Sequence, residues 1–80
     1  MIKNIKFNHK IMALGLYLEL IQNDGVQIFV DKKLARTFPH AEIQQSVITQ
    51  NCVRLFLKQG EKIRVAEINK DGQVSTFTQD

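Results

Sequence analysis

Alternation of apolar and polar residues between short glycine-containing turns is the feature that most constrains this chain. Leucine recurs at every second position from Leu14 to Leu20, and a second alternating run occupies residues 26–30 after a Gln-Asn-Asp-Gly stretch. A period of two places successive side chains on opposite faces of an extended strand. The pattern therefore predicts antiparallel strands joined by tight turns.

The loop between these two runs determines how the predicted strands pair. With residues 23–25 as a three-residue loop, Leu20 lies opposite Ile28 and Leu18 lies opposite Val30. The aliphatic side chains of both strands then share one face, whereas a two-residue loop would divide them between faces. We therefore predict the three-residue loop, with its glycine in the positive φ region.

A helix over residues 9–22 is the alternative for the first run. Asn8 is a suitable capping residue, and Ile11, Leu14 and Leu18 lie at helical spacing. That helix would be apolar on every side, which suits only a fully enclosed helix. We favour the strand and keep an α+β fold with a helix at 9–22 as the alternative.

The rest of the chain extends the pattern. Residues 33–38 predict a short strand that ends at Pro39. Residues 40–48 are expected to form either one short helix or a loop with an extended end. Alternating runs at 53–58 and 62–68 predict a second hairpin, and a glycine turn leads from it into a final strand.

Length and composition support one domain over residues 1–80. Eighty residues with 44% apolar content suit a single globular unit and argue against disorder. We expect a mainly β fold, a small antiparallel meander or barrel of five to six short strands with at most one short helix near 40–48. The lone Cys52 excludes an intrachain disulfide and favours a reducing compartment.

The N-terminal segment has the outline of a secretory signal, because Lys3, Lys6 and Lys10 precede an apolar run. Glu19 interrupts that run, and no pattern of small residues marks a cleavage site after it. The run is also about half of the roughly 20 apolar residues that a membrane span needs. We therefore expect a cytoplasmic protein with no membrane association.

The second predicted hairpin carries the surface that suggests a function. If Gln59, Gly60 and Glu61 form its loop, one face holds the aliphatic residues and the other holds four cations around one aromatic side chain. These are Arg54, Phe56, Lys58, Lys62 and Arg64. Facing cations repel one another, and nucleic-acid phosphates would relieve that repulsion. A base could stack on Phe56, a contact of about 1–3 kcal/mol.

These residues predict a small nucleic-acid-binding or regulatory protein that contacts single-stranded RNA or DNA. In the alternative arrangement, Phe56 lies on a second core face and the cations surround its edge. The net charge of +3 arises in residues 1–40, where Lys32, Lys33 and Arg36 form a secondary basic patch. This patch is also explained as a solvated loop.

A second functional class is a protein-interaction module, an adaptor or inhibitor without catalysis. Tyr17, Ile21 and Phe29 are predicted on the face opposite the leucines, where they form an apolar patch with polar edges. The first strand is long, and a long edge strand invites pairing with another chain. We therefore expect a protein partner or a homodimer, formed through this patch or through an edge strand.

No sequence motif supports catalysis, a cofactor or a metal site. The glycines are isolated, and the serines lack the flanking glycines of a nucleophile turn. His9, His40 and Cys52 do not stand at the spacing of metal ligands. An enzyme would need one of these histidines beside Cys52 in a cleft, and we predict that the protein is not an enzyme.

Overall fold

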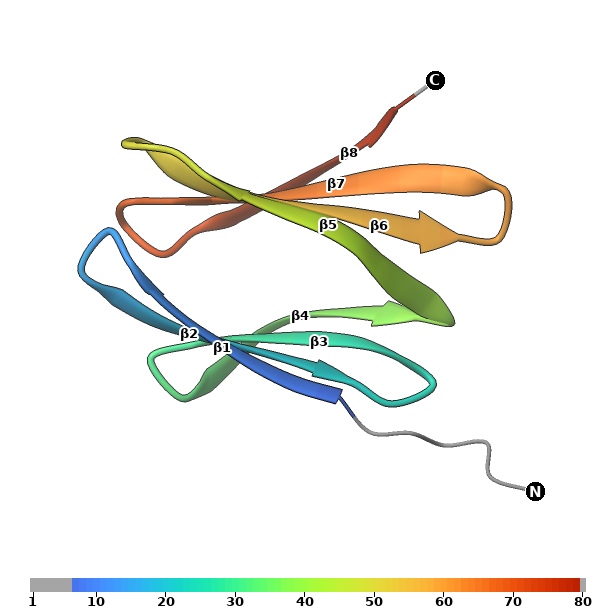
Figure 1. Ribbon diagram of the computed structural model, residues 1–80, viewed down its shortest axis with the longest axis horizontal. Helices are drawn as coiled ribbons and strands as arrows, with labels where there is room; N and C mark the ends of the chain where they lie inside the picture. The colour runs from blue at the N-terminus through green and yellow to red at the C-terminus, as the bar shows by residue number, and fades with distance from the viewer. Residues whose placement is uncertain (1–6, 80) are drawn as a thin grey trace.

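The computed structural model describes residues 7–79, and within this range the chain forms eight antiparallel strands. They build two four-stranded sheets, sheet A with the order β1-β2-β3-β4 and sheet B with the order β5-β6-β7-β8. The two sheets lie face to face (Figure 1). The strands are β1 (Phe7–Ala13), β2 (Leu16–Gln22), β3 (Gly25–Val30), β4 (Lys33–Pro39), β5 (Ala41–Ile48), β6 (Cys52–Gln59), β7 (Lys62–Asn69) and β8 (Val74–Gln79).

The predicted mainly β class is confirmed, but the strand number and the closure are corrected. Eight strands replace the expected five to six, and the two sheets remain open instead of closing into a barrel. The short helix considered for residues 40–48 is wrong, because β5 occupies this segment. The two sheets each bury one face against the other, which is a second way to cover an apolar sheet surface.

The alternative helix at 9–22 is also wrong, and the single long strand preferred there is divided in two. Leu14 and Gly15 form a turn between β1 and β2, with φ of +58° and +74°. Two positive φ values in a two-residue loop are typical of the type I′ turn, whose twist matches that of the adjoining strands. The expected long edge strand is therefore a hairpin, and β2 is an inner strand of sheet A.

The predicted register of the hairpin formed by β2 and β3 is confirmed. Leu18 pairs with Val30, and Leu20 pairs with Ile28. The left-handed φ in the connection belongs to Asp24, at +59°, while Gly25 has a φ of +143° at the start of β3. A Cβ atom at Gly25 would lie 3.0 Å from the backbone oxygen of Phe38, so this position also requires the absence of a side chain.

The core lies between the sheets and draws equally on both. Most of its fully buried side chains come from the inward faces of the two inner strands of each sheet, and each stabilises the fold by about 1.5–3 kcal/mol relative to exposure. They include Leu18, Leu20, Val26 and Ile28 in sheet A and Val53, Leu55, Leu57 and Ile68 in sheet B. The outer face of each sheet, the face that points away from the other sheet, lies outside this cluster.

Polar contacts join the sheets at their rims. The register of β5 against β6 shifts between Ile43 and Gln45, and the Ile43 amide donates to Oε1 of Gln22 in sheet A at 3.1 Å. Nη2 of Arg36 in β4 donates to Oγ1 of Thr76 in β8 at 3.0 Å. These bonds connect the two sheets at the edge of the shared core, and they place the side chain of Arg36 at the rim between the sheets.

Candidate interaction surfaces

The predicted basic face of the second hairpin is corrected by the register of β6 and β7. Gln59 pairs with Lys62, so the loop contains only Gly60 and Glu61 rather than three residues. Gly60 has a φ of +67°, as expected for glycine at the first position of a two-residue hairpin loop. A shift by one residue moves every side chain of β7 to the opposite face. The five predicted residues therefore do not form one surface.

Arg54, Phe56 and Lys58 lie on the outer face of sheet B, whereas Arg64 and Lys62 lie on the side that faces sheet A. Arg64 pairs with Leu57, and its guanidinium carbon lies 5.9 Å from the centre of the Phe38 ring of β4. Its Nη1 donates to Oε1 of Gln59 at 3.1 Å. The Arg64 side chain thus packs at the interface between the sheets and is directed away from Phe56.

Arg54, the first residue of the predicted site, has a partner of opposite charge. Its Nε donates to Oε2 of Glu67 at 2.7 Å across the strand pair. This hydrogen bond raises the pKa of the Arg54 guanidinium and lowers the pKa of the Glu67 carboxyl. Neutralisation by Glu67 reduces the attraction of this side chain for phosphate.

Three apolar side chains form a row across the outer face of sheet B. Phe56 pairs with Val65, and Val65 pairs with Phe77 of β8. Val65 is only 2% exposed, because side chains on the neighbouring strands cover it, while Phe77 is 50% exposed at the edge of the sheet. The row therefore ends at β8 with a half-exposed aromatic ring.

The predicted secondary basic patch lies at the start of β4 and along its inward side. Lys32 occupies the turn between β3 and β4, with a φ of +70°. Lys33 pairs with Val30, and Arg36 pairs with Ile28, so both begin on the core-facing side of an edge strand. All three residues are exposed, and Arg36 bonds to Thr76. Lys3 and Lys6 of the basic N-terminal segment lie outside the described residues.

The outer face of sheet A carries the predicted interface residues together. Tyr17 and Ile21 lie on β2 and Phe29 lies on β3, all on the face opposite the buried leucines. Two residues that were not predicted complete this surface: Met12 pairs with Tyr17, and Leu34 pairs with Phe29. We call the set of Met12, Tyr17, Ile21, Phe29 and Leu34 the sheet A patch.

The two added residues of the sheet A patch are the more exposed ones. Met12 is 79% exposed and Leu34 is 53% exposed, whereas the other three side chains are half-buried by their neighbours. A signal for Met12 was present in the sequence, since Gly15 is a turn residue, and a turn at this position would have separated β1 from β2. The position of Leu34 on this face depends on the irregular register of β3 and β4, which shifts between Ile28 and Phe29. The pairing of a strand that contains a bulge does not follow from alternation alone.

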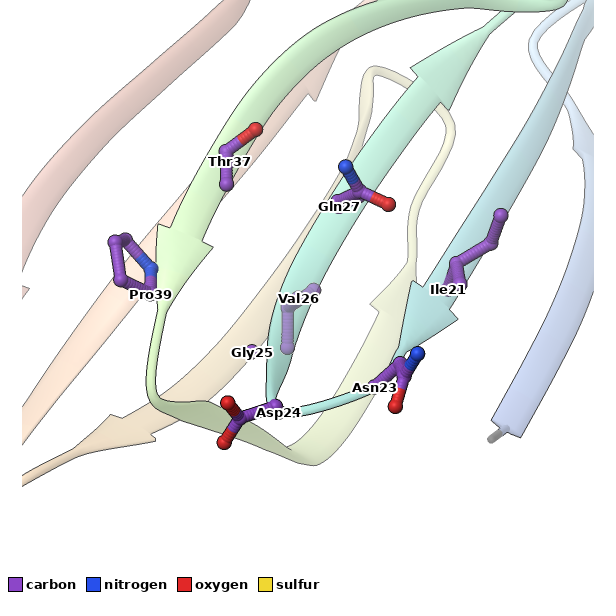
Figure 2. Close-up of a pocket in the computed structure, with 8 residues that line it drawn as sticks. All are labelled: Ile21, Asn23, Asp24, Gly25, Val26, Gln27, Thr37 and Pro39. Atoms are coloured by element: carbon purple, nitrogen blue, oxygen red, sulfur yellow. The ribbon is translucent and has the colours of Figure 1, made fainter. Parts of the chain in front are cut away.

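A shallow hollow of about 350 Å³ lies next to the sheet A patch, where β2, β3 and β4 approach the turn at Asp24. Figure 2 shows Ile21, Gln27 and Thr37 side by side on three neighbouring strands, with Pro39 at the end of β4. Nδ1 of His40 lies 3.9 Å from Oδ1 of Asp24, and both side chains are well exposed. The hollow adds polar groups to one end of the patch.

The groups considered for catalysis are dispersed over the molecule. Cys52 is buried at the start of β6, where its Sγ lies 3.5 Å from Oε2 of Glu67. His9 lies on β1 of sheet A, and His40 lies in the connection between the sheets. In the described range, no three His, Cys, Asp or Glu residues are grouped so that they could hold a metal ion.

Comparison with known proteins gives no function for this chain, so the functional conclusion rests on the surfaces described above. Residues 7–79 contain no helix of the length and apolar character required to cross a membrane. Neither the protein-family models, nor the curated proteins, nor the solved structures contain a match to this chain.

Proposed function

We propose that this protein is a protein-interaction module that binds an apolar surface of another protein through the sheet A patch. The observation that carries the proposal is the exposure of large apolar side chains on a sheet face that the core does not use. Met12 and Leu34 are each more than half exposed, and they flank Tyr17 and Phe29 on the same face. A contiguous apolar patch of this kind is typical of binding surfaces in soluble proteins.

The composition of the sheet A patch indicates the chemistry of its partner. Methionine and aromatic residues are enriched in the centres of protein interfaces, and methionine adapts readily to the shape of a partner. Lys10 and Glu19 face each other within this surface, so charges of both signs lie beside the apolar side chains. An apolar partner surface with a mixed polar rim therefore suits the patch better than a strongly charged one.

Leu34→Glu tests the proposal, with Ile48→Glu as its matched control. Leu34 is 53% exposed and Ile48 is 55% exposed, but Ile48 lies on sheet B. A photo-crosslinking residue placed at position 34 identifies the partner in cells, and the partner is then purified for binding measurements. We expect Leu34→Glu to weaken its binding at least about tenfold, or about 1.4 kcal/mol, and Ile48→Glu to leave it unchanged.

Two results would contradict this function. The first is equal binding of the purified partner by the wild-type protein and by Leu34→Glu. The second is crosslinking at position 34 to another copy of this chain alone, which would assign the patch to self-association. A thermal melt of each variant separates loss of binding from loss of the fold.

Binding of single-stranded RNA or DNA stays a prediction that no observation tests. Arg54, Phe56 and Lys58 still share one outer face, which supports it, but Arg54 is paired with Glu67. If such binding exists, Lys58→Ala is expected to reduce its salt dependence by about one phosphate contact. Arg64→Ala is expected to leave the salt dependence unchanged, because Arg64 packs over Phe38 and away from the outer face.

A further inference from the structure

The four edge strands of residues 7–79 differ in how they are protected against pairing with another chain. Natural sheets protect their edges with charged residues, proline or bulges. The strand β1 carries Lys10 at its centre, and β4 carries Lys33, Arg36 and Pro39 together with a register shift. The strand β5 contains Glu42 and a register shift against β6. Three of these edges therefore have at least one protective feature.

The fourth edge, β8, has none of these features. Its sequence, Val-Ser-Thr-Phe-Thr-Gln, contains no charged residue and no proline. Its register against β7 runs without a shift from Val74 to Gln79. Valine, threonine and phenylalanine favour extended structure. The strand thus presents a regular, uncharged edge.

The hydrogen-bond pattern of the β7–β8 hairpin shows which backbone groups are directed outward. The Asn69 amide donates to the backbone oxygen of Gln73 at 3.1 Å, so these residues form a hydrogen-bonded pair. Such pairs alternate with non-hydrogen-bonded pairs along an antiparallel ladder. Ser75, Phe77 and Gln79 therefore bond to β7, while the amide and carbonyl groups of Val74, Thr76 and Thr78 point away from it.

From these observations we infer that the protein forms a homodimer by antiparallel pairing of β8 with β8 of a second copy. The outward groups of Thr76 and Thr78 meet the same groups of the partner across a two-fold axis, which joins the two B sheets into one eight-stranded sheet. An uncharged strand can pair with itself without placing like charges opposite each other. In β1 the same arrangement would bring two copies of Lys10 together.

The half-exposed ring of Phe77 supports a second copy as the occupant of this edge. It ends the outer row formed with Phe56 and Val65, and 50% of it is exposed in the single chain. Pairing of two β8 strands places the two Phe77 rings opposite or diagonal to each other, within reach of aromatic contact. The two apolar rows then become one continuous row. Arg36 binds Thr76 from the core-facing side, outside the plane of the backbone bonds.

Thr78→Pro tests the dimer, with Thr78→Val as its control. Proline removes an amide that is directed away from β7, so the monomer keeps its hairpin ladder while the free edge loses a donor and gains a ring. Sedimentation equilibrium is expected to give the wild-type protein and Thr78→Val twice the monomer mass of 9.2 kDa. Thr78→Pro should raise the dimer dissociation constant at least roughly tenfold.

A monomeric wild-type protein at high micromolar concentration would overturn the inference, as would a Thr78→Pro protein that dimerises like the wild type.

If Thr78→Pro fails to fold, as judged by its thermal melt, two cysteine variants decide the question. Phe77→Cys or Thr76→Cys in a Cys52→Ser background should give an intermolecular disulfide under mild oxidation. Absence of the crosslink from both folded variants would contradict pairing through β8. The patch variant Leu34→Glu should dimerise normally, so this test is independent of the proposed partner binding.

Discussion

The outer faces of the two sheets differ in how much of their apolar surface remains open to a partner. On sheet A, Met12 and Leu34 stand exposed at the two outer strands and flank the half-buried aromatic residues. On sheet B, Val65 is almost fully covered by its neighbours, and the only large exposed apolar group of its row is Phe77 on the edge strand. Sheet A therefore offers a partner an exposed apolar face, whereas sheet B offers the edge of its outermost strand.

The protection of the edges follows the same division. Both edge strands of sheet A carry cationic residues, and these strands also contribute Met12 and Leu34 to the sheet A patch. Sheet B has one protected edge, β5, and one unprotected edge, β8. Charges on an edge discourage strand addition but do not prevent a partner from covering the adjacent face. The two sheets of one small core can thus serve two different modes of association.

Truncation on the two outer faces should have unequal effects on stability. Val65→Ala removes a side chain that is 2% exposed, and we expect it to lower the free energy of unfolding by roughly 1–2 kcal/mol. Leu34→Ala, on the exposed patch, should change it by less than about 0.5 kcal/mol. Urea denaturation measures both, with Leu55→Ala in the shared core as a reference for a loss of about 2–5 kcal/mol. Equal losses in the free energy of unfolding for Val65→Ala and Leu34→Ala would contradict the difference between a covered outer face on sheet B and an exposed one on sheet A.

The ion pair on sheet B should make a smaller contribution, visible as a pH dependence. The hydrogen bond from Arg54 lowers the pKa of Glu67 in the folded protein. The contribution of Glu67 is therefore complete above its unfolded pKa, about 4.3, and is lost as the pH falls through the lower folded pKa. Carboxyl titration by NMR should show that Arg54→Met raises the Glu67 pKa. A pKa that does not move in this variant would show that the pair contributes nothing to sheet B.

The accuracy of the prediction depended on how clearly each strand separates its two faces. In β2 the leucines occupy one face, and only one loop length keeps them there, so the register with β3 followed from burial. In β7 both faces are apolar, with Ile63 and Val65 on the outer side and Ala66 and Ile68 on the inner side. Hydrophobicity did not distinguish the two registers, and the loop around Gly60 allowed either length.

The candidate sites depended on these registers in the same way. Tyr17, Ile21 and Phe29 were placed together correctly because the register of β2 and β3 was correct. Arg64 and Lys62 were assigned to the wrong face because the register of β6 and β7 was shifted by one residue. The β8 edge was not predicted, since an edge is defined by the order of strands in the complete sheet rather than by the sequence of one strand.

Amide hydrogen exchange along β8 is the most direct test of the claim that sheet B associates through its edge. The amides of Ser75 and Phe77 bond to β7 and serve as internal references for a folded strand, whereas those of Thr76 and Thr78 are directed outward. We predict that the Thr76 and Thr78 amides are protected at high protein concentration and lose this protection on dilution. Rapid exchange of both amides at every concentration, with Ser75 and Phe77 still protected, would contradict the account.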